Sequence, residues 1–484
     1  MLIVEETRLQ QIASTMQKTL ELQKSAFLAD GVADYKTRID RLDRLRSLLG
    51  ENRHLLCEAL SLDFGHRSID HAQLTEIAAP VAGLEYTKRH LRKWMKAEQR
   101  KIPLLFSLLG ARATVRYQPL GSVGVIVPWN FPVYLTMGPL TGIIAAGNRA
   151  MVKPSEFTPR VSDLLCELFG KYFDKSEIAV FPGGADVSAA FSELPFDHLL
   201  FTGAGSIARH VMRAASANLV PVTLELGGKS PTIISRDADL EKAAISIMDF
   251  KLSNAGQICI APDYLLVPEE KLNEVVSVME QTVRRLFPTL IDNPDYTSIV
   301  NERHFQRLQS YVDDALAAGV EMVEINPAGD DFSNQPYFKM PPRLFLNPGD
   351  DRLIMQNEIF GPLLPIKTYK QVEEAIDYIN RHDRPLALYY FGLADGAEVE
   401  QVISRTLSGG VAINDVAAQA GCESLPFGGI GPSGMGVYHG FDGFKSFSHG
   451  RGIYKQSRIN LSDLFGLRPP YGPKFRKAIK NMMK

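Results

Sequence analysis

The chain has 484 residues, of which 45% are hydrophobic and 22% are charged, and its formal net charge is -2. This length is enough for about two or three domains, and the composition is that of a globular protein with a large core. A nearly neutral chain has no electrostatic field that would gather nucleic acid or anionic lipid, so neither is expected as a partner.

The first hundred residues have the pattern of helices. In one segment apolar residues recur at helical spacing, and Gly50 follows as the expected end of that helix. Glu5 and Glu6 stand where a secretory signal peptide would carry basic residues, so no such signal is expected. The apolar residues of the helical segment are Ile39, Leu42, Leu45, Leu48 and Leu49.

Short apolar runs separated by amphipathic segments follow. Residues 117–148 carry no charge, but the four prolines among them argue against a membrane-spanning helix. Helices are expected at 160–173 and 206–217, and strands at 123–127, 150–153, 178–181, 198–201 and 222–226.

This alternation predicts a parallel sheet that is covered by helices on both faces. Ligands bind such sheets at the carboxyl ends of the strands. Segments 128–131, 153–156, 182–184 and 202–205 are therefore expected along one edge. A second alternating region, from 230 to about 413, predicts another α/β unit, and a glycine-rich stretch follows at 426–436.

The four cysteines, Cys57, Cys166, Cys259 and Cys422, are far apart and form no C-x-x-C pair. The histidines likewise show no metal-ligand spacing. Neither a disulfide framework nor a metal site is expected. Cys57 and Cys166 are interpreted as small buried hydrophobes, and Cys422 as a structural residue.

Residues 201–208 read FTGAGSIA and contain G-x-G-x-x-A between an expected strand and an expected helix. The pattern is typical of a turn that binds a pyrophosphate at a helix N-terminus, although an ordinary tight turn needs the same glycines. Glu225 lies on the next strand, where a dinucleotide fold often keeps its ribose-binding acid. Glu156, which leaves the second strand with Lys153, is the better ribose candidate. It could equally begin a helix, whose dipole favours an acidic residue.

Five segments together resemble the aldehyde dehydrogenase superfamily. They occur in the family's order and lie between about residues 115 and 445. The form GQICIAPDY is most similar to the class-three and fatty-aldehyde branch and, within it, to bacterial coniferyl aldehyde dehydrogenases. The segments are PWNFP (128–132), VTLELGGKSP (222–231), NAGQICIAPDY (254–264), EIFGP (358–362) and PFGGIGPSGMG (426–436).

The resemblance implies a role for each matching residue. Cys259 matches the nucleophile, Glu225 the general base, and Asn130 the amide that stabilises the oxyanion. Lys153 and Glu156 match contacts to the adenosine ribose. Glu358 and Phe360 match the nicotinamide-ribose side, and the turn near the pyrophosphate comprises Gly203, Ala204, Gly205, Ser206, Ile207 and Ala208. The family commonly has a small polar residue in place of Ala204 and glycine in place of Ala208.

The resemblance also implies an α/β fold with a Rossmann-like parallel-sheet cofactor domain, a second α/β catalytic domain and a small β oligomerisation segment. The expected bounds are 1–101 with 123–228 for the dinucleotide-binding domain and 229–412 for the catalytic domain. Residues 102–122 with 413–456 form the bridging segment, and 457–484 form a tail.

The expected activity is oxidation of an aldehyde, aromatic or phenylpropenyl by resemblance, to the carboxylic acid through a thioester on Cys259. Since a carboxylate at Glu156 would repel a 2′-phosphate, NAD is expected as cofactor, with NADP as the alternative. Tyr134, Phe131 and Phe250 either line an apolar tunnel or belong to the core. A fatty-aldehyde dehydrogenase, a CoA-acylating enzyme and a non-catalytic protein on the same fold remain as alternatives, although a CoA-acylating enzyme would not need Glu225.

The family resemblance also implies a homodimer in which an edge strand pairs across subunits. The basic amphipathic tail, residues 474–484, is expected to dock on a subunit surface rather than on a membrane. Unlike membrane-bound relatives, the chain shows no hydrophobic anchor at its end, which favours a cytoplasmic enzyme without a membrane partner.

Overall fold

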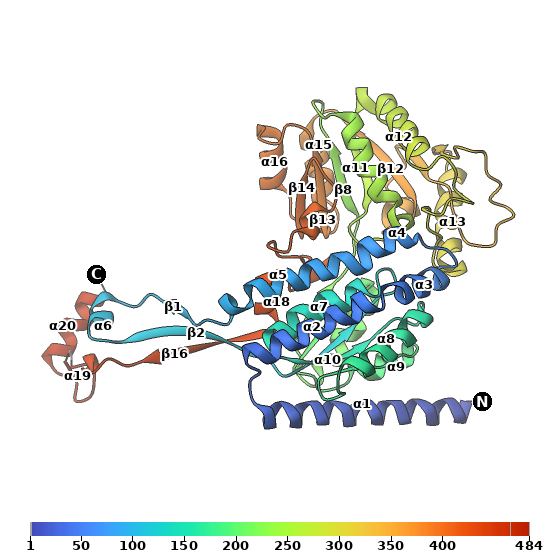
Figure 1. The fold of residues 1–484 in the computed structure, drawn as a ribbon. Coiled ribbons are helices and arrows are strands. Elements are labelled where there is room, and N and C mark those ends of the chain that lie inside the picture. Colours follow the sequence, from blue (N-terminus) through green and yellow to red (C-terminus); the bar gives the residue numbers. More distant parts are fainter. Residues whose placement is uncertain (1, 465, 484) are drawn as a thin grey trace.

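The computed structural model describes residues 2–464 and 466–483, and three β-sheets organise them (Figure 1). The first sheet has six strands in the order β15-β7-β6-β3-β4-β5, all parallel except β15. The five predicted strands of the first half are thereby confirmed. The strands are β3 (Ser122–Ile126), β4 (Arg149–Lys153), β5 (Ile178–Val180), β6 (His198–Thr202), β7 (Val222–Glu225) and β15 (Gly434–Met435).

Helices cover both faces of this sheet, so successive residues of a strand enter different cores. Val152 packs in the larger core beneath α2, α3, α5, α7 and α8, whereas Met151 packs against α1, α9 and α10. A strand buried on both faces reads as a continuous apolar run. The helices are α1 (Leu2–Asp30), α2 (Tyr35–Glu51), α3 (Arg53–Asp63), α4 (Ile69–Ala72), the π-helical turn η1 (Gln73–Ala78), α5 (Ala79–Trp94), α7 (Tyr134–Ala146), α8 (Pro159–Tyr172), α9 (Ala185–Ser192) and α10 (Gly205–Ser216).

The expected helix end at Gly50 was wrong by one residue. Helix α2 runs through Gly50 to Glu51, and Asn52 follows as its C-cap. The Asn52 side-chain amide donates to the carbonyl of Leu48 at 2.9 Å, which satisfies one of the last carbonyls of the helix. A polar side chain therefore ends this helix instead of a glycine in a left-handed conformation.

The second sheet has seven strands in the order β10-β11-β12-β9-β8-β13-β14, parallel except for the pair β10 and β11. It confirms the second α/β unit. Its strands are β8 (Ser230–Ile234), β9 (Pro262–Pro268), β10 (Glu321–Glu324), β11 (Arg343–Leu346), β12 (Leu363–Tyr369), β13 (Ala387–Phe391) and β14 (Gly410–Ile413). Its helices are α11 (Leu240–Leu252), η2 (Ser253–Gly256), η3 (Glu269–Lys271), α12 (Leu272–Leu286), α13 (Glu302–Ala317), α14 (Leu353–Gln356), α15 (Val372–Asn380), α16 (Ala397–Arg405) and α17 (Ala418–Gly421).

A three-stranded antiparallel sheet, β1-β2-β16, projects from the body as an arm (Figure 1). Residues 98–100 belong to this sheet and not to the layer around the first sheet; the domain bounds as a whole stay a prediction. The elements of this region are β1 (Glu98–Arg100), α6 (Leu104–Leu108), β2 (Arg112–Pro119), α18 (Gly440–Ser446), β16 (Ser448–Lys455), α19 (Leu461–Leu464) and α20 (Pro473–Met482).

Across the described residues, no helix is both long enough and apolar enough to cross a membrane. Cys57 is buried as expected, and Cys166 is half-buried. The Cys422 side chain is exposed beside the Ser424 hydroxyl, and its interpretation as a structural residue stays a prediction. The tail forms α20, in which no described residue is buried, and Lys484 lies outside the described residues.

Candidate active site

The carboxyl edge of the first sheet brings most of the predicted site residues together. The parallel registers of β3, β4, β6 and β7 place the ends of these strands side by side. Asn130 follows β3, Lys153 ends β4, and Glu225 ends β7. The turn 203–208 connects β6 with α10. The expectation that these motifs share one edge is therefore confirmed.

Cys259 lies in a loop between η2 and β9, from the second α/β unit, and the backbone before it is strained. Asn254 and Ala255 have left-handed φ angles of 48° and 51°, and Gly256 follows with a φ of 74°. Non-glycine residues adopt this region at a cost of about 1–3 kcal/mol each, and such strain is concentrated at functional sites. The neighbouring Gln257 side chain secures the loop.

Gln257 makes three hydrogen bonds that tie the cysteine loop to the body. Its Nε2 donates to the carbonyls of Asn254 at 2.8 Å and Ser298 at 3.0 Å, and its Oε1 accepts from the Val300 amide at 2.9 Å. The side chain is fully buried. Because its hydrogen-bonding capacity is largely used, Gln257 fixes the strained loop two residues before the thiol.

The Cys259 thiol is half-buried, and the charges of two carboxylates act on it. Burial is the main reason why the pKa of this thiol is raised to about 12, and the charges of Glu358 and Glu225 raise it further. The backbone N–H groups of Cys259 and Ile260 face the sulfur and lower its pKa. Removing a proton from Cys259 is therefore coupled to the charge on both glutamates.

Glu225 is buried at the end of β7, and neither of its carboxylate oxygens has a hydrogen-bond partner among the described residues. Burial raises the pKa of this carboxyl well above its usual range. Glu225 forms no ion pair with Lys229, four residues further along the chain, because the Lys229 ammonium pairs with Asp263. A buried carboxyl with no structural partner is a candidate general base.

Glu358 reaches the same region from a loop that three charged residues secure. Lys229 donates to the carbonyl of Asn357 at 2.9 Å, Asp263 accepts from the Ile359 amide at 2.9 Å, and Arg307 donates to the Ile359 carbonyl at 2.8 Å. Burial and the charge of Asp263 raise the pKa of Glu358 to about 8.

The Glu358 carboxylate lies directly against the Gly227–Gly228 turn. A Cβ atom at Gly227 would lie 2.1 Å from Glu358 Oε1, so no larger residue fits there without a shift of the glutamate. The Gly228 backbone N–H lowers the pKa of this carboxyl. The double glycine after Glu225 thus makes room for a second carboxylate near the cysteine.

Asn130 is 4% exposed and lies against the cysteine loop. Its Nδ2 donates to the Gln257 carbonyl at 3.1 Å, and its own carbonyl accepts from Asn254 Nδ2 at 3.2 Å. A side-chain amide has two N–H donors, so one remains for a ligand. The structure thus joins Asn130 of the first unit to the loop of Cys259.

The residues expected to hold a dinucleotide have donors and space that fit such a ligand. The buried Lys153 ammonium has three N–H donors but, among the described residues, donates only to the Pro154 carbonyl, at 2.6 Å, with Glu156 Oε2 3.8 Å away. Glu156 is exposed beside it. At α10 the N-cap Ala204 makes no side-chain capping bond, and a Cβ at Gly205 would have only one neighbour, at 4.0 Å. An uncapped helix N-terminus suits a phosphate.

Phe360 lies in the same loop of the second α/β unit as Glu358, two residues further along the chain. Its φ of 49° is left-handed, and its ring meets the Trp129 ring edge-on with centroids 5.4 Å apart. The ring of Trp129 also lies 4.9 Å from that of His304. The Phe360 loop is thereby packed onto the residues just before Asn130.

Of the three aromatic residues considered for a substrate tunnel, Tyr134 lines a small cavity. Its hydroxyl lies 3.2 Å from His439 Nε2, and the cavity, of about 10 Å³, has room for one water molecule. Phe131 is buried, and Phe250 packs against the main core. A tunnel lined by all three stays a prediction.

Sequence reasoning missed the residues that fix the site, because each is far in sequence from the side chain that it holds. Arg307 is about fifty positions from the Glu358 loop, and Arg67, which donates to the Asn130 carbonyl at 2.9 Å, lies 63 positions away. Asp263 stands within a quoted motif, but its ion pair with Lys229 could not be inferred from spacing. Within the described residues, no group of three or more His, Cys, Asp and Glu side chains is arranged to hold a metal ion.

Comparison with known proteins gives consistent matches along the chain. The profile of the aldehyde dehydrogenase family matches residues 9–452. A protein of Caulobacter vibrioides named "Probable coniferyl aldehyde dehydrogenase" is 54% identical over 97% of both chains, and a "Coniferyl aldehyde dehydrogenase" of Pseudomonas sp. is 51% identical over 95% of this chain and 94% of its own.

Two solved structures extend this comparison to the fold. The "Substrate bound state of Staphylococcus Aureus AldH" superposes with a TM-score of 0.89 at 36% identity, covering 96% of this chain and 99% of its own. An indole-3-acetaldehyde dehydrogenase of P. syringae in complex with NAD+ and IAA superposes with a TM-score of 0.82 at 25% identity, covering 92% and 89%.

Proposed function

The chain belongs to the aldehyde dehydrogenase family, and we propose that it oxidises an aldehyde to the carboxylic acid through a covalent intermediate on Cys259. The observation that supports this best is the surroundings of the thiol: the charges of the Glu225 and Glu358 carboxyls act on it, and Asn130 lies against its loop. Each of these groups has a separate task in the reaction.

In the first step the Cys259 thiol passes its proton to a water molecule, and the sulfur forms a bond to the carbonyl carbon of the aldehyde. The carbonyl π electrons move to oxygen, which becomes an alkoxide. The free N–H of Asn130 Nδ2 and the Cys259 backbone N–H would stabilise this alkoxide. Losing one such preorganised donor typically lowers the rate about 100- to 1000-fold.

In the second step the alkoxide collapses, the C–H bond breaks, and a thioester remains on Cys259. When bound, NAD supplies the acceptor for the hydride that leaves. Lys153, Glu156 and the α10 N-terminus would hold the adenosine and pyrophosphate portion, and Glu358 and Phe360 the nicotinamide-ribose portion.

In the third step Glu225 takes a proton from water while the water oxygen adds to the thioester carbon. The carbon–sulfur bond then breaks, the carboxylic acid leaves, and the cysteine is regenerated. A carboxylate that acts as a general base typically contributes about 100- to 10,000-fold. Since a CoA-acylating enzyme needs no such base, the buried and unpartnered Glu225 favours hydrolysis over transfer to CoA.

The proposed substrates are phenylpropenyl aldehydes such as coniferyl aldehyde. This rests on the names of the relatives at 54% and 51% identity, which extend over nearly the whole chain. We propose NAD as the preferred cofactor because the Glu156 carboxylate would repel the 2′-phosphate of NADP.

We also propose that the protein is a homodimer that pairs through the projecting arm. Several large apolar side chains of the arm are exposed, which is typical of an interface. These include Leu104, Leu105, Leu108, Ile453, Tyr454 and Tyr471.

The test is NADH formation from coniferyl aldehyde and NAD by the wild-type protein and by Cys259→Ala. The variant should produce no NADH, whereas the control Cys166→Ala, at a half-buried thiol in α8, should keep the wild-type rate. Turnover by Cys259→Ala would remove the nucleophile assignment. A rate that requires added CoA would replace hydrolysis by acyl transfer.

A further inference from the structure

A buried ion pair contacts the loop that carries Asn130. Arg67, between α3 and α4, and Glu76, in η1, both have side chains that are 0% exposed, and Arg67 Nη2 lies 2.9 Å from Glu76 Oε1. Burial lowers the pKa of Arg67 and raises that of Glu76, and the charge of each partner opposes the shift of the other. The two groups therefore depend on each other to remain charged.

This ion pair holds the Asn130 loop at both of its ends. Arg67 Nη1 donates to the Asn130 carbonyl at 2.9 Å. Glu76 Oε2 accepts from the amides of Val133 at 3.0 Å and Tyr134 at 2.7 Å, where α7 begins. One rigid unit thus fixes the first and the last residues of segment 130–134.

The Arg67 guanidinium is also held by aromatic rings. The centroids of the Phe64 and Phe131 rings lie 4.9 and 4.7 Å from its central carbon. Phe131 directly follows Asn130, so the cation contacts the loop through a ring as well as through a carbonyl. A planar guanidinium can do this while it donates from separate nitrogens, whereas an ammonium cannot.

We propose that Arg67 and Glu76 are positioning residues that aim the Asn130 amide at the alkoxide formed on Cys259. The proposal rests on the proposed function, in which Asn130 stabilises that alkoxide. Stability alone is a weak explanation, since apolar residues of similar volume often stabilise a protein as well as a buried ion pair does. The contacts instead converge on one backbone carbonyl and two amides of the catalytic loop.

The test is a double-mutant cycle with Arg67→Lys and Asn130→Ala. Lysine keeps the positive charge but loses the planar fork, so the rate constant of the NADH burst should fall about tenfold in the wild-type background while the Kd for NAD stays unchanged. In the Asn130→Ala background the same change should alter the burst by less than about twofold, because the amide it positions is absent.

Glu76→Gln serves as a second variant, because glutamine keeps a carbonyl acceptor for the Val133 and Tyr134 amides and is expected to give a milder loss of the same kind. The control is Arg41→Lys, at the ion pair with Glu177 at the opposite edge of the sheet, which should leave the burst unchanged.

Equal losses with and without Asn130 would overturn the positioning role, as would failure of both variants to fold, which would make the pair structural. An inactive wild-type protein would instead defeat the proposed function.

Discussion

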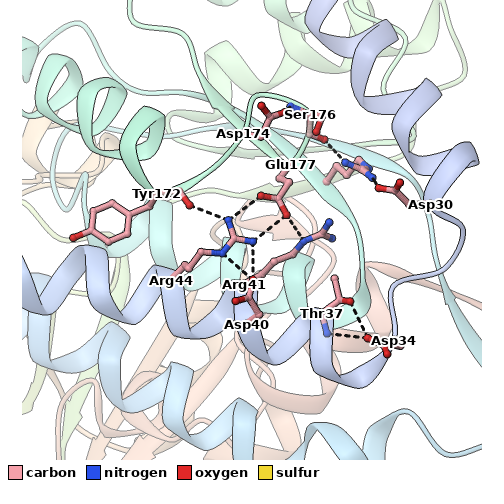
Figure 2. A network of polar contacts seen from close by, with 11 residues as sticks. Asp30, Asp34, Thr37, Asp40, Arg41, Arg44, Tyr172, Asp174, Ser176 and Glu177 are labelled. Carbon is pink, nitrogen blue, oxygen red and sulfur yellow. Dashed lines mark hydrogen bonds and ion pairs between the residues drawn. The ribbon is translucent and has the colours of Figure 1, made fainter.

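Two glutamates at opposite edges of the same sheet, Glu177 half-buried and Glu225 buried, have opposite surroundings. Glu177, just before β5, accepts hydrogen bonds from Arg41 Nε at 2.8 Å and from two nitrogens of Arg44 at 2.8 and 3.0 Å (Figure 2). Burial alone would raise its pKa, but these bonds and charges lower it to about 2. Glu225, at the carboxyl edge, has no such partner among the described residues, and burial raises its pKa.

This contrast separates carboxylates that hold the fold from those available for chemistry. In the network of Figure 2, Arg44 also donates to the Tyr172 carbonyl at 2.8 Å, so that α2, α8 and the start of β5 are joined. A saturated carboxylate cannot accept a proton from water near neutral pH. The carboxylate without partners costs stability but keeps its capacity to act as a base.

Exchanging each glutamate for glutamine tests this difference in surroundings most directly. Glu225→Gln should lower steady-state turnover about 100- to 10,000-fold while the first equivalent of NADH still forms, because only hydrolysis of the thioester needs the base. Stopped-flow absorbance measures both phases. Glu177→Gln is the matched control and should keep the wild-type turnover; a loss of the NADH burst in Glu225→Gln would mean that Glu225 acts before hydrolysis.

The pH dependence of thioester hydrolysis tests whether Glu225 acts as the base. Glu225 acts as a base only when it is deprotonated, and its pKa is raised. The thioester-hydrolysis rate should therefore increase about tenfold per pH unit below that pKa and then level off. Single-turnover measurements at fixed acyl-enzyme loading would show this, and a rate independent of pH from 5 to 9 would contradict the assignment.

The hydrogen bonds and ion pairs of Glu177 should also stabilise the folded protein. Glu177→Gln should lower the free energy of unfolding by about 2 kcal/mol at pH 7, the scale of hydrogen bonds to charged groups. The folded pKa, about 2, lies below the ordinary value of 4.5, so this contribution is present above pH 4.5 and is lost as the pH falls toward 2. Urea denaturation at several pH values should show the difference from wild type disappearing in acid.

The sequence predicted the architecture and the motif positions, and its errors have physical causes. Apolar runs bounded by turns located β3 to β7, because strands buried on both faces are apolar along most of their length. The proposed roles of Cys259 and Glu225 came from the family resemblance. The structure shows how far each side chain is buried and which groups surround it. The contacts of Arg67, Lys229 and Arg307 connect residues distant in sequence and follow no local period, so only the folded chain reveals them.

The smallest effect is expected at Glu156. Its surroundings are intermediate between those of Glu177 and Glu225, because its carboxylate is exposed but lies near the buried Lys153 ammonium. Glu156→Gln removes a charge that would repel a 2′-phosphate but keeps a hydrogen-bonding side chain. Exposed charges act through solvent, with energies of about 0.2–1 kcal/mol, so kcat/KM for NADP relative to NAD should rise only a few-fold. Steady-state assays with both cofactors measure this ratio. An unchanged ratio would show that Glu156 does not face the 2′ position, and the cofactor preference would then need another source along the same edge.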